Sequence, residues 1–99
     1  MSPPSPTTHP TPITIVVSEA CHWCEEAHRA LEEFAQTYPV TIESIDAREE
    51  AGQRLLHAHA ASMYPLVLVD GRYFSHGRMP RRRLGSLLSQ RYAEPSAAF

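Results

Sequence analysis

Two cysteines separated by two residues, Cys21 and Cys24, are the only cysteines in this sequence of 99 residues. A pair at this spacing can cycle between a dithiol and an intramolecular disulfide, or it can supply two thiolate ligands to a metal ion. A purely structural disulfide is the weakest interpretation, because it would close a loop too short to remove much entropy from the unfolded chain. The spacing therefore indicates thiol–disulfide exchange or metal binding.

Exchange requires two sulfurs with different tasks. We expect Cys21 to begin a helix, where free backbone N–H groups and the helix dipole stabilise a thiolate. Cys24 lies one turn deeper and is expected to be less exposed. The Cys21 thiolate would attack a substrate disulfide, and Cys24 would then attack Cys21 and release the reduced product. His22 is either an exposed residue or, when protonated, a further stabiliser of the Cys21 thiolate.

Metal binding needs more ligands than this pair provides. The sequence has no second cysteine pair, and His57 and His59, two positions apart in a predicted helix, do not share a face. His28 is interpreted as a helix-surface histidine. Covalent haem attachment would require a histidine directly after Cys24, where the sequence has glutamate. We therefore predict no bound metal and no cofactor.

The segments around the pair predict an α/β domain. Residues 13–17 and 66–69 are strongly apolar, and 40–46 alternates, so we predict strands there. Asp70-Gly71 predicts a hairpin that returns as a strand over 72–75. We predict helices over 21–38, over 47–62 despite the helix-weakening Gly52, and after Pro80. The order β-α-β-α-β-β-α predicts a four-stranded mixed sheet with helices on both faces. The apolar residues expected on the inner face of the first helix are Trp23, Ala27, Ala30, Leu31, Phe34 and Tyr38, and those of the last helix are Leu84, Leu87, Leu88 and Tyr92.

Composition sets further limits. Residues 1–12 are rich in Pro, Ser and Thr and are predicted to be a disordered tail, followed by one domain over 13–93 and a frayed tail over 94–99. A net charge of −2 offers no basic field for nucleic acid. The sequence has neither an apolar run of about 20 residues nor an export signal. We expect a cytoplasmic monomer that binds no membrane.

Pro65, preceded by Tyr64, stands at the entry to the strand 66–69. A proline at the start of a strand is ordinary. The sharper hypothesis is a cis Tyr64–Pro65 bond, which would turn the Tyr64 backbone outwards beside Cys21. An extended substrate peptide could then pair with that backbone.

With these elements in order, the segment from Ile13 to about Tyr92 resembles a glutaredoxin-type thioredoxin fold, a three-layer α/β/α architecture. The motifs that carry the resemblance are Cys21-His22-Trp23-Cys24, Met63-Tyr64-Pro65, the Val69-Asp70-Gly71 hairpin and Gly77 before the last helix. The resemblance implies that Cys21 is the nucleophile, that Cys24 resolves the mixed disulfide and that Pro65 is cis. It also implies that the substrate groove is lined by His22, Trp23, Tyr64, Pro65 and Gly77.

The resemblance also implies partners, namely a disulfide-containing protein substrate and an electron donor. Residues 74–78 are similar to glutaredoxin-like redoxins, which take electrons from thioredoxin reductase. Ser18, Glu19 and Arg78 differ from the family where glutathione binds, and the donor stays open between glutathione, another low-molecular-weight thiol and a reductase of that type. Some glutaredoxin-like proteins hold an iron–sulfur cluster, which is the alternative function. We interpret the arginines at 81–83 as a solvated helix start rather than a docking patch for an acidic partner.

Overall fold

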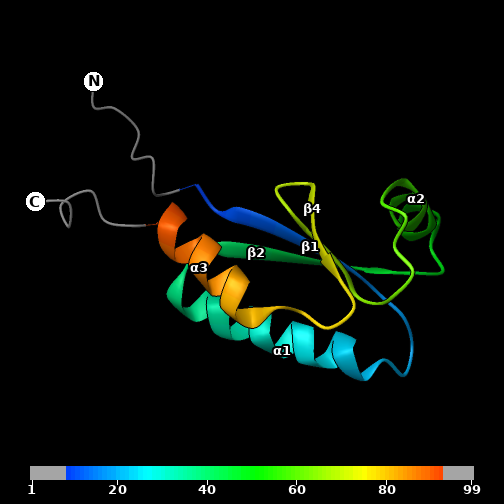
Figure 1. Cartoon of the computed structure of the whole chain (residues 1–99), viewed down its shortest axis with the longest axis horizontal. Coiled ribbons are helices and arrows are strands. Elements are labelled where there is room, and N and C mark those ends of the chain that lie inside the picture. Colours follow the sequence, from blue (N-terminus) through cyan, green and yellow to red (C-terminus); the bar gives the residue numbers. More distant parts are fainter. Residues whose placement is uncertain (1–8, 93–99) are drawn as a thin grey trace, which may run out of the picture.

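Strands and helices alternate along the chain in the predicted order (Figure 1). The computed structural model describes residues 9–92, and the predicted tails lie outside this range except for residues 9–12. The elements are β1 (Thr11–Val17), α1 (His22–Thr37), β2 (Val40–Asp46), α2 (Glu50–Ala58), β3 (Leu66–Val69), β4 (Arg72–His76) and α3 (Arg81–Arg91). None of the helices within residues 9–92 is long and apolar enough to cross a membrane.

The four strands form one mixed sheet in the order β2-β1-β3-β4. β1 and β2 are parallel, whereas β3 is antiparallel to both β1 and β4. Val16 pairs with Leu66, and Leu66 pairs with His76. The end of β1, the start of β3 and the end of β4 therefore meet at one edge of the sheet. The segment that carries the cysteines and the one that carries Pro65 both adjoin this edge.

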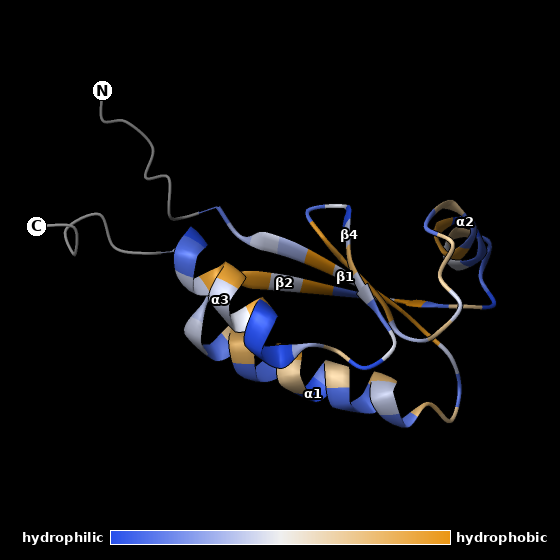
Figure 2. Cartoon of the chain, viewed as in Figure 1, coloured by the Kyte–Doolittle hydropathy of each residue, from blue (hydrophilic) through white to orange (hydrophobic). Residues whose placement is uncertain are grey.

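Helices cover both faces of the sheet, with α1 and α3 on one side and α2 on the other (Figure 1). The alternation of side chains along β1 explains this division. Ile13 and Ile15 are buried against α1 and α3, whereas Val16 is buried on the α2 side. The strands at the centre of the sheet carry the strongest hydrophobic colouring in Figure 2, as expected for strands covered on both faces.

β1 begins at Thr11, two residues earlier than predicted. Thr11 is completely buried, its N–H donates to the carbonyl of Pro39, and its hydroxyl lies 2.6 Å from the hydroxyl of Tyr92. Arg91 also donates to the Thr11 hydroxyl. The assignment of residues 11 and 12 to a tail was therefore wrong, because side chains from the end of α3 hold this segment in the sheet.

α2 is shorter than the predicted helix over 47–62 and occupies only Glu50–Ala58. At its start, the N–H of Ala47 donates to the carbonyl of Val17, and the Asp46 carboxylate accepts from the N–H of Arg48. Both contacts hold the chain outside a helix. At its end, Ala60 adopts a left-handed conformation with φ of 50°.

The predicted Asp-Gly hairpin is confirmed, with positive φ at Asp70 and Gly71. β4 continues to His76 and contains an irregularity that the sequence did not indicate. Val67 pairs with Ser75 and Leu68 pairs with Tyr73, which leaves Phe74 as an extra residue in β4. This bulge allows Phe74 to join the core beneath α3.

Candidate active site

Cys21 and Cys24 form a disulfide at the start of α1, with their Cα atoms 5.1 Å apart. Cys21 is the N-cap residue in an extended conformation, and its sulfur accepts a hydrogen bond of 3.1 Å from the N–H of Cys24. Ala20, at φ of 52°, turns the chain from β1 into this position. The predicted placement of Cys21 at the helix start is confirmed.

The two sulfurs occupy different environments. Cys21 is partly exposed, whereas Cys24 is only 6% exposed and packs on the inner side of α1. A thiolate formed on Cys21 by reduction would face the N–H groups and the positive end of a 16-residue helix. The acidic residue in the first turn, Glu25, opposes this effect. The arrangement provides one accessible sulfur at an anion-stabilising position and one protected sulfur behind it.

The residues between the cysteines are exposed. The side chain of His22 is 76% exposed, and its Nε2 lies 3.0 Å from Oε2 of Glu26, one helical turn further along α1. Trp23 is 37% exposed, and its predicted place on the inner face of the helix was wrong. Cys24, Ala27, Ala30 and Leu31 are the buried residues of α1, so the buried stripe begins at Cys24 and leaves Trp23 outside it.

The Tyr64–Pro65 peptide bond is cis, as the sharper hypothesis required. The carbonyl of Pro65 accepts a hydrogen bond of 3.1 Å from the N–H of Gly77, and a Cβ on Gly77 would lie 3.6 Å from Met63. Pro65 and Gly77 are buried, and Tyr64 packs against the core on the α2 side. These three residues thus shape the loop, while Met63, 44% exposed, presents its side chain to solvent.

Sequence analysis did not include Met63 among the substrate-binding residues. The exposure of its side chain is unusual, because Met63 and Trp23 are two of only three large hydrophobic side chains exposed within residues 9–92. Both lie in segments that adjoin the same edge of the sheet. Met63 is therefore a candidate for substrate contact that the sequence pattern did not single out.

A small groove of about 230 Å³ lies behind the disulfide. It reaches Cys24 and is lined by two titratable side chains, Glu25 and His28, together with Ser44. His28 directs Nδ1 to Glu32 at 3.3 Å. The groove is large enough to hold water molecules. His28, interpreted from the sequence as a surface histidine, is exposed and lines the same groove as Cys24.

An arginine fixes the loop that leads to Cys21. Arg48 contacts Glu19 at 3.3 Å and Asp46 at 2.9 Å, which links this loop to the end of β2. Hydrogen bonds from the side chain and backbone of Arg48 lower the pKa of Asp46 from 3.8 to about 2. The same contact raises the pKa of Arg48.

Comparison with known proteins defines the fold. No protein-family profile and no curated protein sequence matches this chain. Among solved structures, a mutant thioredoxin from Halobacterium salinarum NRC-1 is 18% identical with a TM-score of 0.61, covering 89% of this chain and 79% of that one. Thioredoxin O2 from Arabidopsis thaliana is 21% identical with a TM-score of 0.63, covering 83% and 75%. A thioredoxin-like protein from Clostridium perfringens is 16% identical with a TM-score of 0.66, covering 82% and 70%.

The chain therefore has a thioredoxin-like fold, with the predicted four-stranded mixed sheet and three helices. A cysteine pair at the start of the first helix of such a fold supports a thiol oxidoreductase in general. Within residues 9–92, no cluster of three or more His, Cys, Asp or Glu side chains could hold a metal ion.

Proposed function

We propose that this protein is a thiol–disulfide oxidoreductase that reduces disulfides in proteins or low-molecular-weight compounds through Cys21 and Cys24. The observation that carries the proposal is the asymmetry of the two sulfurs. Cys21 is accessible at the N-terminus of α1, and Cys24 is buried within disulfide reach of it. A structural disulfide would not need one accessible sulfur at the end of a helix dipole.

The reaction begins from the dithiol. The Cys21 thiolate attacks one sulfur of the substrate disulfide, a bond forms between Cys21 and that sulfur, and the other substrate sulfur leaves as a thiolate that takes up a proton. Cys24 then loses its proton and attacks the Cys21 sulfur, which releases the second substrate thiol. Two electrons have passed from the protein to the substrate, and the disulfide seen in the structure is the oxidised product.

The second step requires a proton acceptor for a buried thiol. Burial in apolar surroundings disfavours the thiolate, so an acceptor near Cys24 speeds its attack. Glu25 and His28 are the titratable side chains that line the groove behind Cys24. We propose that His28 takes this proton through water, because it lies one helical turn beyond Cys24.

Substrate contacts follow from the exposed residues around Cys21. Trp23 and Met63 supply an apolar surface, and the loop shaped by Tyr64, Pro65 and Gly77 supplies backbone groups for an extended peptide. His22 adds a polar contact at the exposed start of α1. A low-molecular-weight thiol or a reductase of the thioredoxin-reductase type would return the disulfide to the dithiol. We further propose that the protein acts as a monomer in the cytoplasm.

Two variants test the assignment. Cys21→Ser should abolish reduction of a disulfide-bonded peptide, because the attacking sulfur is gone. Cys24→Ser should react once and accumulate a mixed disulfide whose mass equals protein plus substrate thiol minus two hydrogens. Full reductase activity in Cys21→Ser would refute the proposal.

A redox titration separates this function from the metal-binding alternative. We expect a reversible two-electron transition between about −270 and −120 mV, the range of known dithiol oxidoreductases. Thiol alkylation followed by mass measurement reports the Cys21–Cys24 disulfide at each potential. Absence of that transition, with visible absorbance in protein purified without oxygen, would mean that the pair binds an iron–sulfur cluster.

A further inference from the structure

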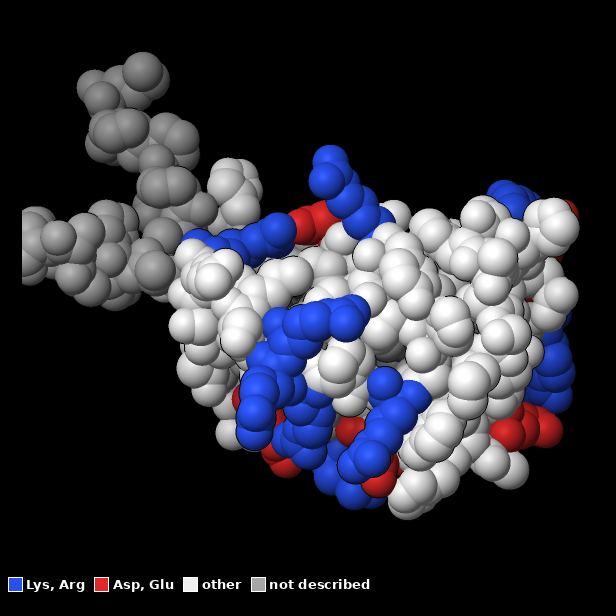
Figure 3. Space-filling view, viewed as in Figure 1, with Lys and Arg blue, Asp and Glu red and all other residues white. Residues whose placement is uncertain are grey.

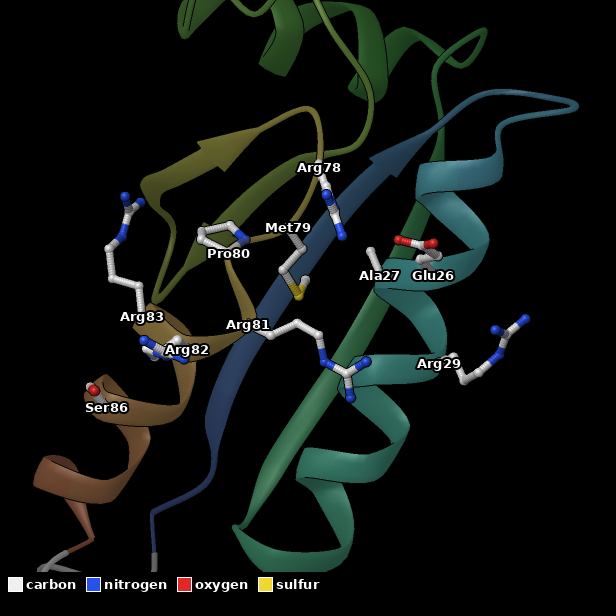
Figure 4. A pocket seen from close by; sticks show the side chains of 10 residues that line it. All are labelled: Glu26, Ala27, Arg29, Arg78, Met79, Pro80, Arg81, Arg82, Arg83 and Ser86. Atoms are coloured by element: carbon white, nitrogen blue, oxygen red, sulfur yellow. The ribbon is translucent and has the colours of Figure 1, made fainter.

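A groove of about 830 Å³ lies between α1 and α3 and is surrounded by arginines (Figure 4). Its apolar part is formed by Ala27, Met79 and Pro80. Arg78 and Arg81 extend toward the space between the two helices (Figure 4). The arginines that line the groove are Arg29, Arg78, Arg81, Arg82 and Arg83, whereas Glu26 is its only acidic lining residue.

Most of this positive charge is not neutralised within the part of the chain that the structure describes. Arg81 pairs with Glu33, and Arg83 donates to the carbonyl of Phe74 and lies over its ring at 4.7 Å. Arg78 and Arg82 are exposed and take part in none of the ion pairs found in residues 9–92. The space-filling view shows a concentration of basic side chains over α3 and the adjoining part of α1 (Figure 3).

The arrangement is unfavourable for the helix that carries it. Three consecutive arginines, Arg81 to Arg83, occupy the first turn of α3, and no acidic residue lies there. Positive charge at this end opposes the helix dipole. Residues that break a local stability rule are expected at functional sites. Arg81 and Arg83 have partners within the protein, Glu33 and Phe74, whereas Arg82 has no ion-pair partner within residues 9–92 and is available to a ligand.

The groove adjoins the segments that we assign to substrate binding. Glu26 and Ala27 lie two and three residues after Cys24 on α1, and Arg78 follows Gly77, whose N–H donates to the carbonyl of Pro65. A polypeptide whose disulfide is attacked by Cys21 can therefore place its neighbouring residues between α1 and α3.

We propose that this groove binds an acidic segment next to the disulfide of a protein substrate. Carboxylates would pair with the free guanidinium groups of Arg78 and Arg82, and the aliphatic parts of the segment would lie on Met79 and Pro80. Nucleic acid is the less suitable partner, because the chain is acidic overall, with a net charge of −2. This inference deepens the proposed function and rests on it.

Three disulfide peptides that differ only in flanking residues, Glu, Gln or Lys, test the inference. We expect the reduced protein to react with the Glu peptide roughly ten times faster than with the Gln peptide at low salt, and slower still with the Lys peptide. The preference should approach unity at about 1 M salt, where exposed charges are screened. The double variant Arg78→Glu with Arg82→Glu should reverse the order of the Glu and Lys peptides.

The matched control is Arg54→Glu with Arg72→Glu, which makes the same change in net charge away from the groove and should keep the wild-type preference. Equal rates for the three peptides, with normal reduction of the Gln peptide, would overturn the inference and leave the proposed function intact. Failure to reduce any peptide would overturn both. Stronger inhibition by a single-stranded oligonucleotide than by polyglutamate would identify nucleic acid as the partner and contradict the inference.

Discussion

Replacing Gly52 by alanine should destabilise the protein, although helix propensity alone predicts the opposite. Gly52 is buried in α2, and a Cβ at this position would overlap the carbonyl oxygen of Asp46 and lie 3.2 Å from the Cα of Ala47. Both neighbours are backbone atoms that cannot rotate away. Either α2 must move off the end of β2 or the segment between them must shift.

The magnitude follows from two opposing contributions. Alanine gains up to about 1 kcal/mol over glycine within a helix. Overpacking at a close contact costs about 1–3 kcal/mol. An overlap with backbone atoms belongs at the upper end of that range, about 2–3 kcal/mol, so after the helix gain of about 1 kcal/mol we expect Gly52→Ala to lower the free energy of unfolding by about 1–2 kcal/mol. At about 4–8 °C per kcal/mol for a domain of this size, the midpoint of thermal unfolding should fall by roughly 4–16 °C.

Gly85 in α3 is the matched control. A Cβ there would lie 3.4 Å from the ring of Phe34, an ordinary van der Waals contact, so Gly85→Ala should stabilise the protein by about 0.5–1 kcal/mol. Urea and thermal unfolding, followed by circular dichroism with the disulfide intact, measure both variants. A Gly52→Ala protein as stable as the parent would refute the close contact between α2 and the end of β2.

Three further predictions concern single contacts. In Arg48→Met, the pKa of Asp46 should rise from about 2 toward 3.8 in a carboxyl NMR titration. The parent should then lose more stability than the variant as pH falls from about 4 to 2, because the variant keeps only the backbone hydrogen bond to Asp46. An unchanged pKa would contradict the contact. His28→Ala should slow the attack by Cys24 about tenfold or more in rapid-quench experiments, without changing the rate of the first attack on substrate. If the variant carried out both steps at the rates of the parent, a proton-acceptor role would be excluded. Tyr92→Phe should cost about 1–2 kcal/mol in urea unfolding, because its hydroxyl bonds the start of β1, and no loss would show that this bond is dispensable.

Periodicity and spacing were sufficient to predict the order of the strands and helices and the position of the cysteine pair at the start of the first helix. Residues 13–17 and 66–69 form strands because β-branched and apolar side chains favour burial on both faces of a sheet. The position of Cys21 followed from its place between the first strand and the first helix. The cis bond before Pro65 came from the family resemblance, since most X–Pro bonds are trans.

The sequence-based predictions were wrong where contacts with segments distant in the sequence determine the burial or conformation of a residue. Trp23 has the spacing of the core residues of α1, but it is the second residue of the helix and is 37% exposed, before the buried stripe begins at Cys24. Thr11 was assigned to a tail because its partner, Tyr92, lies at the other end of the domain. Gly52 was interpreted as a weakness of the helix, whereas contact with the end of β2 excludes a larger residue.

The surroundings of the arginines at the start of α3 could not be predicted from the sequence either. In the sequence, Arg81 to Arg83 are an unfavourable helix start, and solvation is the simplest explanation. In the structure, α1 lies beside α3, and Arg78 joins the three arginines around one groove that also reaches Glu26 and Ala27 of α1. Charges that are costly for one helix become useful when a second helix turns them into a binding surface. Because Glu33 pairs with Arg81 and the carbonyl of Phe74 accepts from Arg83, the proposed acidic ligand has to account only for Arg78 and Arg82.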